Sequence, residues 1–195
     1  TLAETGNGWM CWSDATNTKS NQTGGDSVIH SSNLCVEITE VTSPGEVAVC
    51  NLASINLAQH TDRQGVDWAK LMETVRIAVT YLDRVIDRNF YPTVESSRSN
   101  LAWRPIGLGV MGLADVFFKL GLDFDSTEAQ DLSKRISETI YWAALSVSAD
   151  LAERHGTYPN FAQSRLAVTG EISPDLWGAE TSDLLDWDGL RARLQ

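Results

Sequence analysis

Cysteine is scarce in this sequence, and long hydrophobic runs are absent. The three cysteines, Cys11, Cys35 and Cys50, are an odd number without the CxxC spacing of a zinc site, and they are too few for a disulfide-stapled secreted fold. The longest nearly uncharged stretch, 106–118, contains Asp115 and is shorter than the ~20 apolar residues that cross a bilayer. We therefore expect a cytoplasmic protein with no bound metal and no membrane span.

Positive charge is also in short supply. Lys and Arg number 15 against 26 Asp and Glu, which gives a formal net charge of -11. Such a surface repels phosphates, which excludes nonspecific binding to nucleic acid or to anionic lipid. With 43% hydrophobic residues the chain can still bury a core. It starts at Thr1 without an initiator Met or a signal peptide, which suggests a piece of a larger protein.

Apolar spacing and capping signals predict two long helices. Asp67 opens the first, and its apolar residues recur at intervals of three and four until Pro92 marks its end. The other begins with a capping box of Asp125 and Glu128 and continues to a C-cap glycine, Gly156. We expect each helix to bury one apolar stripe.

The segment between these helices is less regular. Residues 96–104 are polar and basic and predict a connector. Pro105 then starts a glycine-containing helix that runs to about Leu120 and stops at Gly121. A short terminal helix is expected over 182–194.

The N-terminal third predicts loop and strand rather than helix. Its opening residues are rich in Gly, Asn, Ser and Thr, with Trp9, Met10 and Trp12 as the strong apolar anchors. Residues 28–57 contain two strand-like runs separated by a turn signal at 42–46. This pattern favours a hairpin-like pair.

The run 32–38 alternates strictly between polar and apolar residues. In a strand, the amide of Asn33, the thiol of Cys35 and the carboxylate of Glu37 would share one face. Neighbouring side chains on that face would lie about 7 Å apart, two rises of ~3.3 Å, a span comparable to a sugar ring. A half-exposed strand whose polar face simply meets water is the alternative.

A second thiol follows after the turn. Pairing of the run 46–52 with the run 32–38 would bring Cys50 near Cys35, within reach of one substrate. A buried Cys50 with a purely structural role is the alternative, because free cysteines are commonly buried.

Several segments resemble one family in the same order along the chain. The runs 31–38 (SSNLCVEI) and 46–54 (EVAVCNLAS) are similar to the active-site segment of the large (alpha) subunit of class I ribonucleotide reductase. Three further segments carry the resemblance, at 17–22, 104–115 and 183–187. The resemblance therefore covers almost the whole chain.

The resemblance implies a role for each of four residues. Cys35 matches the cysteine that becomes a thiyl radical and takes the 3′ hydrogen from the ribose of the substrate. Glu37 matches the carboxylate that accepts the 3′-hydroxyl proton, and Asn33 matches the amide that holds the ribose hydroxyls. Cys50 matches one of two thiols that end as a disulfide when the 2′-hydroxyl leaves as water.

The resemblance also implies a fold and partners. Residues 1–195 would be part of a catalytic α/β barrel of ten strands, with active-site strands and a finger loop over 1–60 and a mainly helical portion over 61–195. The expected activity is reduction of ribonucleoside diphosphates to deoxyribonucleotides for DNA synthesis. This chain would hold no cofactor. A metal-containing small (beta) subunit would supply the radical, thioredoxin or glutaredoxin would supply electrons, and the intact large subunit would form an alpha homodimer.

Some residues depart from this pattern. The partner of Cys50 lies upstream in the family, and Cys11 matches no family thiol, so we interpret Cys11 as a packing residue. His30 is assigned a solvated or capping role. We expect the isolated chain to be inactive, because a piece of a barrel cannot exclude water from a radical. A non-catalytic or split-gene fragment that acts only in assembly is the alternative.

A glycine motif suggests a third function. Residues 107–112 match GxGxxG, but no strand is predicted before them, and the dinucleotide fingerprint requires one. We therefore predict close helix packing at these glycines rather than a nicotinamide or flavin site.

Overall fold

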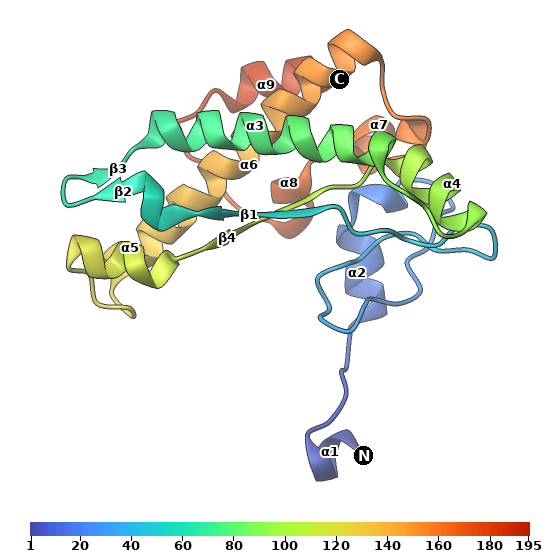
Figure 1. Ribbon diagram of the computed structural model, residues 1–195, viewed down its shortest axis with the longest axis horizontal. Helices are drawn as coiled ribbons and strands as arrows, with labels where there is room; N and C mark the ends of the chain where they lie inside the picture. Colours follow the sequence, from blue (N-terminus) through green and yellow to red (C-terminus); the bar gives the residue numbers. More distant parts are fainter.

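The computed structural model describes residues 1–195 as an α/β arrangement (Figure 1). Its helices are α1 (Leu2–Thr5), α2 (Ser13–Lys19), α3 (Trp68–Arg88), α4 (Val94–Trp103), α5 (Leu113–Leu120), α6 (Thr127–His155), α7 (Arg165–Thr169), α8 (Ser173–Trp177) and α9 (Trp187–Leu194). Its strands are β1 (Leu52–Asn56), β2 (Thr61–Asp62), β3 (Gly65–Val66) and β4 (Gly107–Met111). Short 3-10 turns occupy Asn21–Thr23, Leu57–His60 and Phe161–Gln163. None of the helices combines the length and the apolar character that spanning a membrane requires.

The two long helices, α3 and α6, confirm the helices predicted from apolar spacing. Asp67 caps α3, because its Oδ1 accepts a hydrogen bond of 3.0 Å from the Lys70 amide. The cap of α6 is Ser126 rather than the predicted Asp125, since Ser126 Oγ accepts a hydrogen bond of 3.1 Å from the Ala129 amide. The predicted helix was thus right, and its first residue was displaced by one.

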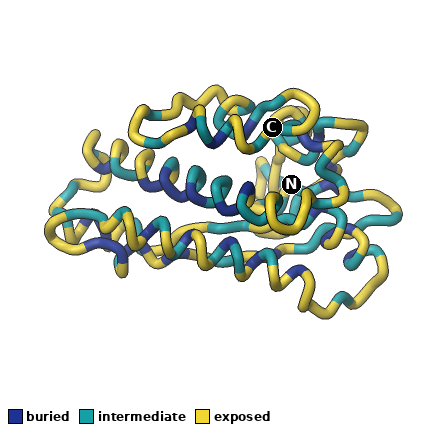
Figure 2. The backbone as a smooth tube through the Cα atoms, turned by 90° about the horizontal axis from the view of Figure 1, so that it is seen from above, coloured by how far each residue is buried: buried dark blue, intermediate teal, exposed yellow.

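Apolar burial between α3, α6, α5 and β1 forms the main core. Figure 2 shows buried positions recurring along the helices. The largest cluster consists of ten buried residues: Ile55, Leu57, Leu71, Val75, Val79, Val116, Ile136, Ile140, Ala143 and Val147. Full burial of one such Val, Leu or Ile side chain contributes about 1.5–3 kcal/mol relative to exposure. This cluster therefore attaches β1 firmly to the helical layer.

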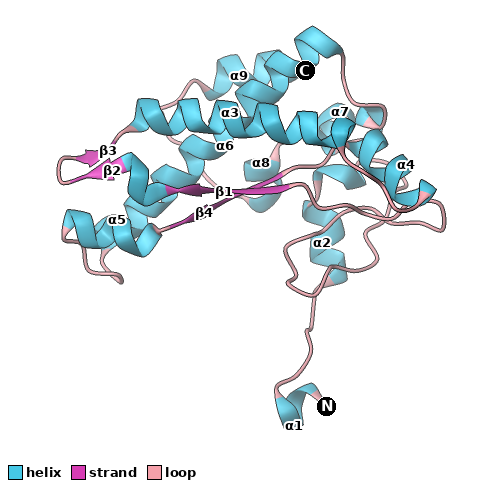
Figure 3. Cartoon of the chain, in the orientation of Figure 1, coloured by secondary structure: helices cyan, strands magenta, loops and turns pink.

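β1 and β4 form a two-stranded parallel sheet (Figure 3). The register pairs Leu52 with Gly107 and Asn56 with Met111. Parallel strands need a crossover connection, and α3 and α4 provide it here. β2 and β3 form a separate antiparallel pair. Each strand of the parallel pair therefore has a single partner.

The connector predicted at 96–104 is wrong, because most of it is helix α4. Thr93 and Ser96 form a capping box at its start. Ser99 and Asn100 are buried, and polar residues can occupy a buried helix face when their hydrogen bonds are satisfied. Composition alone therefore misidentified a packed helix as a connector.

The helix predicted from Pro105 is partly wrong. Its first half is strand β4, and the helix α5 begins only at Leu113. Its predicted end is confirmed, because Gly121 caps α5 with a φ of 67°. The glycines within the first half provide no apolar periodicity, so helix and strand could not be distinguished there.

The two ends of the chain differ in how they pack. The N-terminal segment projects from the body of the molecule (Figure 1), and Trp9, Met10 and Trp12 are 67%, 79% and 80% exposed. Their predicted role as apolar anchors is therefore wrong. The predicted C-terminal helix is confirmed as α9, although it begins at Trp187 rather than at Ser182. The buried Trp187 donates a hydrogen bond of 3.0 Å from Nε1 to Glu138 Oε1.

Candidate active site

Cys35 lies in a tight turn, so the strand predicted over 32–38 is wrong. The Val36 amide donates a hydrogen bond of 3.2 Å to the Asn33 carbonyl, which closes the turn around Cys35. Val36 has a φ of 70°, a left-handed conformation outside the range of β-strands. The alternation of side chains is therefore broken, and Leu34 is 81% exposed instead of lying on an apolar face.

Two polar side chains hold the base of this turn. Asn33 Oδ1 accepts a hydrogen bond of 3.1 Å from the Ile38 amide, and Ser32 Oγ donates one of 2.6 Å to the Ile38 carbonyl. Asn and Ser side chains often bond nearby backbone groups in this way and thereby compete with strand formation. The Nδ2 group of Asn33 has no partner within the chain, so it is free to donate to a ligand.

The predicted hairpin between Cys35 and Cys50 does not form. Its turn exists, because Ser43 and Glu46 exchange two backbone hydrogen bonds of 3.1 Å, but no ladder extends from that turn. Cys50 precedes β1 and is exposed. The alternative of a buried, structural Cys50 is therefore wrong as well.

Cys50 nevertheless lies within electrostatic range of the Cys35 turn. Partial burial raises the pKa of the Cys50 thiol, and negative charge at Glu40, Glu37 and Cys35 raises it further. A raised pKa keeps Cys50 in its thiol form at neutral pH. The arrangement thus combines a protonated thiol, two carboxyl groups and a second cysteine.

A cavity of about 490 Å³ opens beside this cluster, within the usual size range of ligand sites, ~300–1,000 Å³. Its walls include Glu37 and Glu40, Leu52 and Ser54 from β1, and Gly107 and Gly109 from β4. Cys35, Asn33 and Cys50 do not line it. Of the four predicted site residues, Glu37 alone therefore lies on the cavity wall. Asn33 and Cys35 precede it in the sequence, and Cys50 lies within electrostatic range of Glu37 and Cys35.

Comparison with known proteins identifies the family. The family model for the barrel domain of ribonucleotide reductase matches residues 1–195. The chain belongs to the ribonucleotide reductase family. It is 45% identical over 192 residues to the ribonucleoside-diphosphate reductase large subunit of Caenorhabditis elegans, covering 98% of this chain and 24% of that protein.

Two other relatives give the same result. The large subunit of Plasmodium falciparum (isolate Dd2) is 45% identical over 195 residues, which cover 98% of this chain and 24% of the relative. The large subunit of Arabidopsis thaliana is 44% identical over 208 residues, which cover 96% and 25%. This ribonucleotide reductase chain spans about a quarter of the length of the curated relatives it matches.

Cys11 of this ribonucleotide reductase chain is exposed, so the predicted packing role is wrong. It lies between α1 and α2, in the stretch that leads from the projecting N-terminus to the body of the molecule (Figure 1). Cys11 borders a small cavity together with His30 and Val36. His30 is exposed, with Nδ1 3.3 Å from Thr42 Oγ1, in agreement with its predicted solvated role.

The glycine motif of this ribonucleotide reductase chain allows close packing of strands, not of helices as predicted. A Cβ atom on Gly107 would lie 2.5 Å from Leu52 Cδ2. Gly112 has a φ of 77° and caps α5. In a dinucleotide fingerprint the strand precedes the glycines, whereas Gly107 and Gly109 lie within β4. The motif therefore lacks the geometry of a dinucleotide site.

Glu40 is a candidate residue that the sequence analysis missed. It lines the cavity, and burial raises its pKa to about 7, although the Val49 amide favours the charged form. A carboxyl group with such a pKa can hold or release a proton near neutral pH. The sequence signal that could have identified Glu40 is its position, three residues after Glu37 and directly before an apolar residue. That residue, Val41, is 3% exposed.

A second cavity of about 470 Å³ lies at the β2–β3 hairpin and contains no thiol. Both ring nitrogens of His60 are already bonded there, to the Asn56 carbonyl and to Thr74 Oγ1, each at 2.8 Å. Lys70 Nζ donates a hydrogen bond of 2.6 Å to the Gln59 carbonyl. These groups maintain the fold, and no cluster of His, Cys, Asp or Glu in the chain could hold a metal ion.

Proposed function

We propose that this chain is the part of a ribonucleoside-diphosphate reductase large subunit that carries the radical cysteine and one reducing thiol. The observation that carries the proposal is the family match over residues 1–195, which includes the turn bearing Cys35. The turn leads directly into the cavity wall at Glu37. The relatives are named as large subunits of ribonucleoside-diphosphate reductase, which supports ribonucleoside diphosphates as the substrates.

The proposed reaction assigns one step to each site residue. A thiyl radical at Cys35 removes the hydrogen atom from C3′, which forms an S–H bond and leaves a carbon radical. Glu37 accepts the 3′-hydroxyl proton and later returns it. The 2′-hydroxyl leaves as water with a proton from one thiol, and the hydrogen of the other thiol is added at C2′. Cys50 and a thiol from another segment give the two electrons to the sugar and form a disulfide. Cys35 then returns its hydrogen to C3′ and regains the radical.

Several features of the site support these roles. The raised pKa of Cys50 keeps its proton available for the departing hydroxyl. The unpartnered Nδ2 of Asn33 can donate to a ribose hydroxyl. Cys35 carries no disulfide and is therefore available for hydrogen abstraction.

The proposal includes partners. A metal-containing small (beta) subunit would generate the radical, and thioredoxin or glutaredoxin would reduce the disulfide. The term "large subunit" in the names of the relatives supports a small partner. We also propose an alpha homodimer, and a cytoplasmic location, which the three free cysteines support.

Enclosure of the radical is the main physical requirement. Cys35 is exposed in this chain, and a thiyl radical in contact with water and other thiols would be quenched. We therefore expect the 195 residues to turn over substrate only when further segments of the large subunit cover this turn. Turnover by the purified chain with small subunit and reductant would refute this expectation.

The test is substitution of single cysteines in a reconstituted large subunit that contains this segment. Cys35→Ser is expected to abolish turnover and to leave nucleotide binding intact. Cys11→Ser is the matched control and is expected to retain activity, because Cys11 is also an exposed free thiol but matches no thiol of the family. Unchanged turnover in Cys35→Ser would contradict the mechanism. Assembly without turnover in the wild type would favour a purely assembly role.

A further inference from the structure

Asn51 and Asn100 form a buried pair of amides between the start of β1 and the end of α4. Their side chains belong to residues that are 4% and 0% exposed. Asn51 Nδ2 donates a hydrogen bond of 2.7 Å to Asn100 Oδ1, and Asn100 Nδ2 donates one of 3.4 Å to Asn51 Oδ1. A buried amide is costly unless its hydrogen bonds are made, so the pair favours one narrow geometry.

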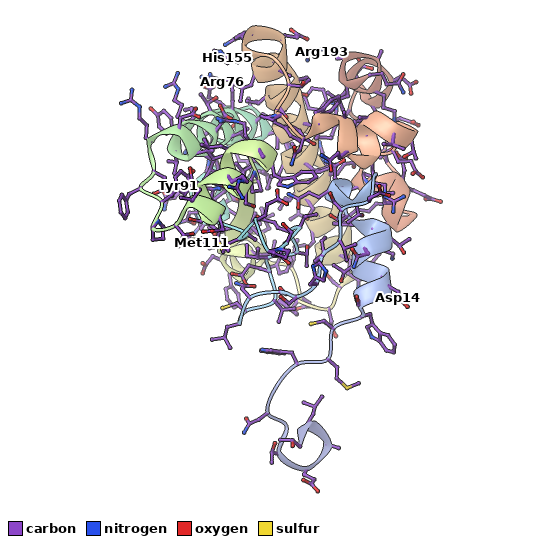
Figure 4. All side chains as sticks on the ribbon, turned by 90° about the vertical axis from the view of Figure 1, so that its right-hand side faces the viewer. Asp14, Arg76, Tyr91, Met111, His155 and Arg193 are labelled. Carbon is purple, nitrogen blue, oxygen red and sulfur yellow. The ribbon has the colours of Figure 1, made fainter.

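The same pair extends to β4 and to α3. Asn51 Nδ2 also donates a hydrogen bond of 2.9 Å to the Pro105 carbonyl, and the Gly107 amide donates one of 2.9 Å to the Asn51 carbonyl. Asn100 Nδ2 donates to Tyr91 Oη, which donates in turn to the backbone of α3. Tyr91 is labelled in Figure 4. Asn51 is thus held through both its side chain and its backbone.

Cys50 is the direct neighbour of this held residue. It lies outside the β1–β4 ladder, whose first pair is Leu52 and Gly107. Ends of strands open more easily than their centres, and a strand rich in glycine specifies its register weakly. Burial of Ile55 in the core fixes which face of β1 points inward. Ile55 lies five residues from Cys50, so its burial does not fix the position of the thiol. The hydrogen bonds of Asn51 provide the attachment close to the thiol.

We propose that the Asn51–Asn100 amide pair positions the Cys50 thiol beside the Cys35 turn, which makes both asparagines positioning residues for the reducing thiol. The role of Cys50 in the reaction rests on the proposed function. The position of the Cys50 thiol can be measured without turnover, so this part of the proposal is independent of that function. A merely structural amide pair is replaceable by apolar residues of similar shape with little loss of stability.

The experiment is the double variant Asn51→Leu/Asn100→Leu of the 195-residue chain. The alkylation rate of each cysteine by iodoacetamide is followed by mass spectrometry from neutral to alkaline pH. When Cys50 is released from Glu37 and Glu40, its apparent pKa falls. A fall of one unit increases the thiolate fraction about tenfold below the pKa, so alkylation of Cys50 becomes several-fold faster at neutral pH.

Two controls separate positioning from general loosening. Cys11 is the internal control, because it is exposed and makes no hydrogen bond to the amide pair, so its alkylation rate is expected to stay unchanged. Tyr91→Phe is the matched variant: it removes one hydrogen bond of Asn100 and leaves the three hydrogen bonds of the Asn51 side chain. We expect the Cys50 profile of Tyr91→Phe to match the wild type.

Each outcome decides the matter. Faster alkylation of Cys50 alone, in a double variant that circular dichroism shows to be folded, supports the proposal. An unchanged Cys50 profile overturns it, because the pair then only fills the core. An unfolded double variant overturns it too, since the pair is then needed for the fold itself. If Cys50 can be removed without loss of turnover, the proposed function fails and the positioning result remains.

Discussion

The side chain of Leu52 occupies the space that a Cβ atom on Gly107 would need. An ideal Cβ at Gly107 would lie 2.5 Å from Leu52 Cδ2, whereas one at Gly109 would have its nearest contact at 3.5 Å, to Ser54 Oγ. Both glycines belong to β4 and line the cavity. They therefore differ in how well they tolerate a larger residue.

Gly107→Ala is expected to destabilise the fold by about 1 kcal/mol, at the low end of overpacking effects. The cost is small because Leu52 is 52% exposed and can rotate toward solvent, but the rotation changes the cavity wall. Gly109→Ala is the matched control and is expected to be nearly neutral. Urea unfolding of both variants measures the difference, and a larger loss at Gly109 would contradict the packing argument.

Val36→Gly is expected to stabilise the fold by roughly 0.5–1 kcal/mol. The change removes the cost of a left-handed conformation, and the larger backbone entropy that glycine loses on folding offsets part of this gain. Val36 holds a φ of 70°, which is unfavourable for a β-branched residue. The same change loosens the turn around Cys35, so turnover of the reconstituted enzyme is expected to fall. Val36→Ala retains a Cβ atom and serves as control. A destabilised Val36→Gly variant would exclude strain at this position.

Glu40→Gln is expected to change how stability depends on pH. Burial raises the pKa of Glu40 from 4.5 to about 7, so between these values the unfolded chain loses a proton that the folded chain keeps. Stability of the wild type therefore falls as the pH rises through this window, by roughly 3 kcal/mol from this group.

The glutamine variant lacks this ionisation and is expected to lose less stability over the same window. Thermal unfolding at a series of pH values measures the difference between the two proteins. Asp26→Asn, at an exposed position, is the control and is expected to follow the wild type. Parallel curves for wild type and Glu40→Gln would show that Glu40 does not titrate there.

Arg104→Gln is expected to cost about 1–2 kcal/mol, because Arg104 makes charge-assisted hydrogen bonds to two half-exposed carboxylates. Arg104 Nη2 lies 2.8 Å from Asp83 Oδ1, and Nη1 lies 2.7 Å from Asp87 Oδ1. The hydrogen bond from Arg104 lowers the pKa of Asp87. This contribution is therefore present above the ordinary aspartate pKa and is lost as the pH falls through the lowered value.

Arg76→Gln provides the comparison for Arg104. Its ion pair with Glu73 joins two side chains that are 55% and 54% exposed, and such surface pairs contribute little. Denaturant unfolding at neutral pH is expected to show a clear loss for Arg104→Gln and no measurable change for Arg76→Gln. Equal losses would indicate that exposure does not determine the strength of these pairs.

The long helices could be predicted because their stability depends on a repeating pattern in the sequence. Leu71, Val75 and Val79 recur at four-residue spacing and are all buried. α4 could not be predicted in this way, since its buried face includes Ser99 and Asn100. The burial of Asn100 is compensated by hydrogen bonds to Asn51 and Tyr91, and no local pattern contains that information.

The candidate site was likewise predictable in part only. The residue types at Asn33, Cys35 and Glu37 indicated the chemistry, but the alternating pattern indicated the wrong backbone. Asn33 accepts a hydrogen bond from the Ile38 amide and Ser32 donates one to the Ile38 carbonyl, and these bonds override the strand propensity of this run. The turn therefore depends on polar side chains, which the apolar alternation does not report.

The single pairing of β1 and β4 has a consequence for handling the chain. Each strand presents one row of backbone donors and acceptors without a strand partner. Neither LASIN nor GLGVM contains a proline or a charged residue, the features that protect strand edges from adhesion. The same strand edges that could extend into a larger sheet can also pair with the edges of other copies of this chain. Dilute solutions and short storage times are therefore expected to keep the chain monomeric.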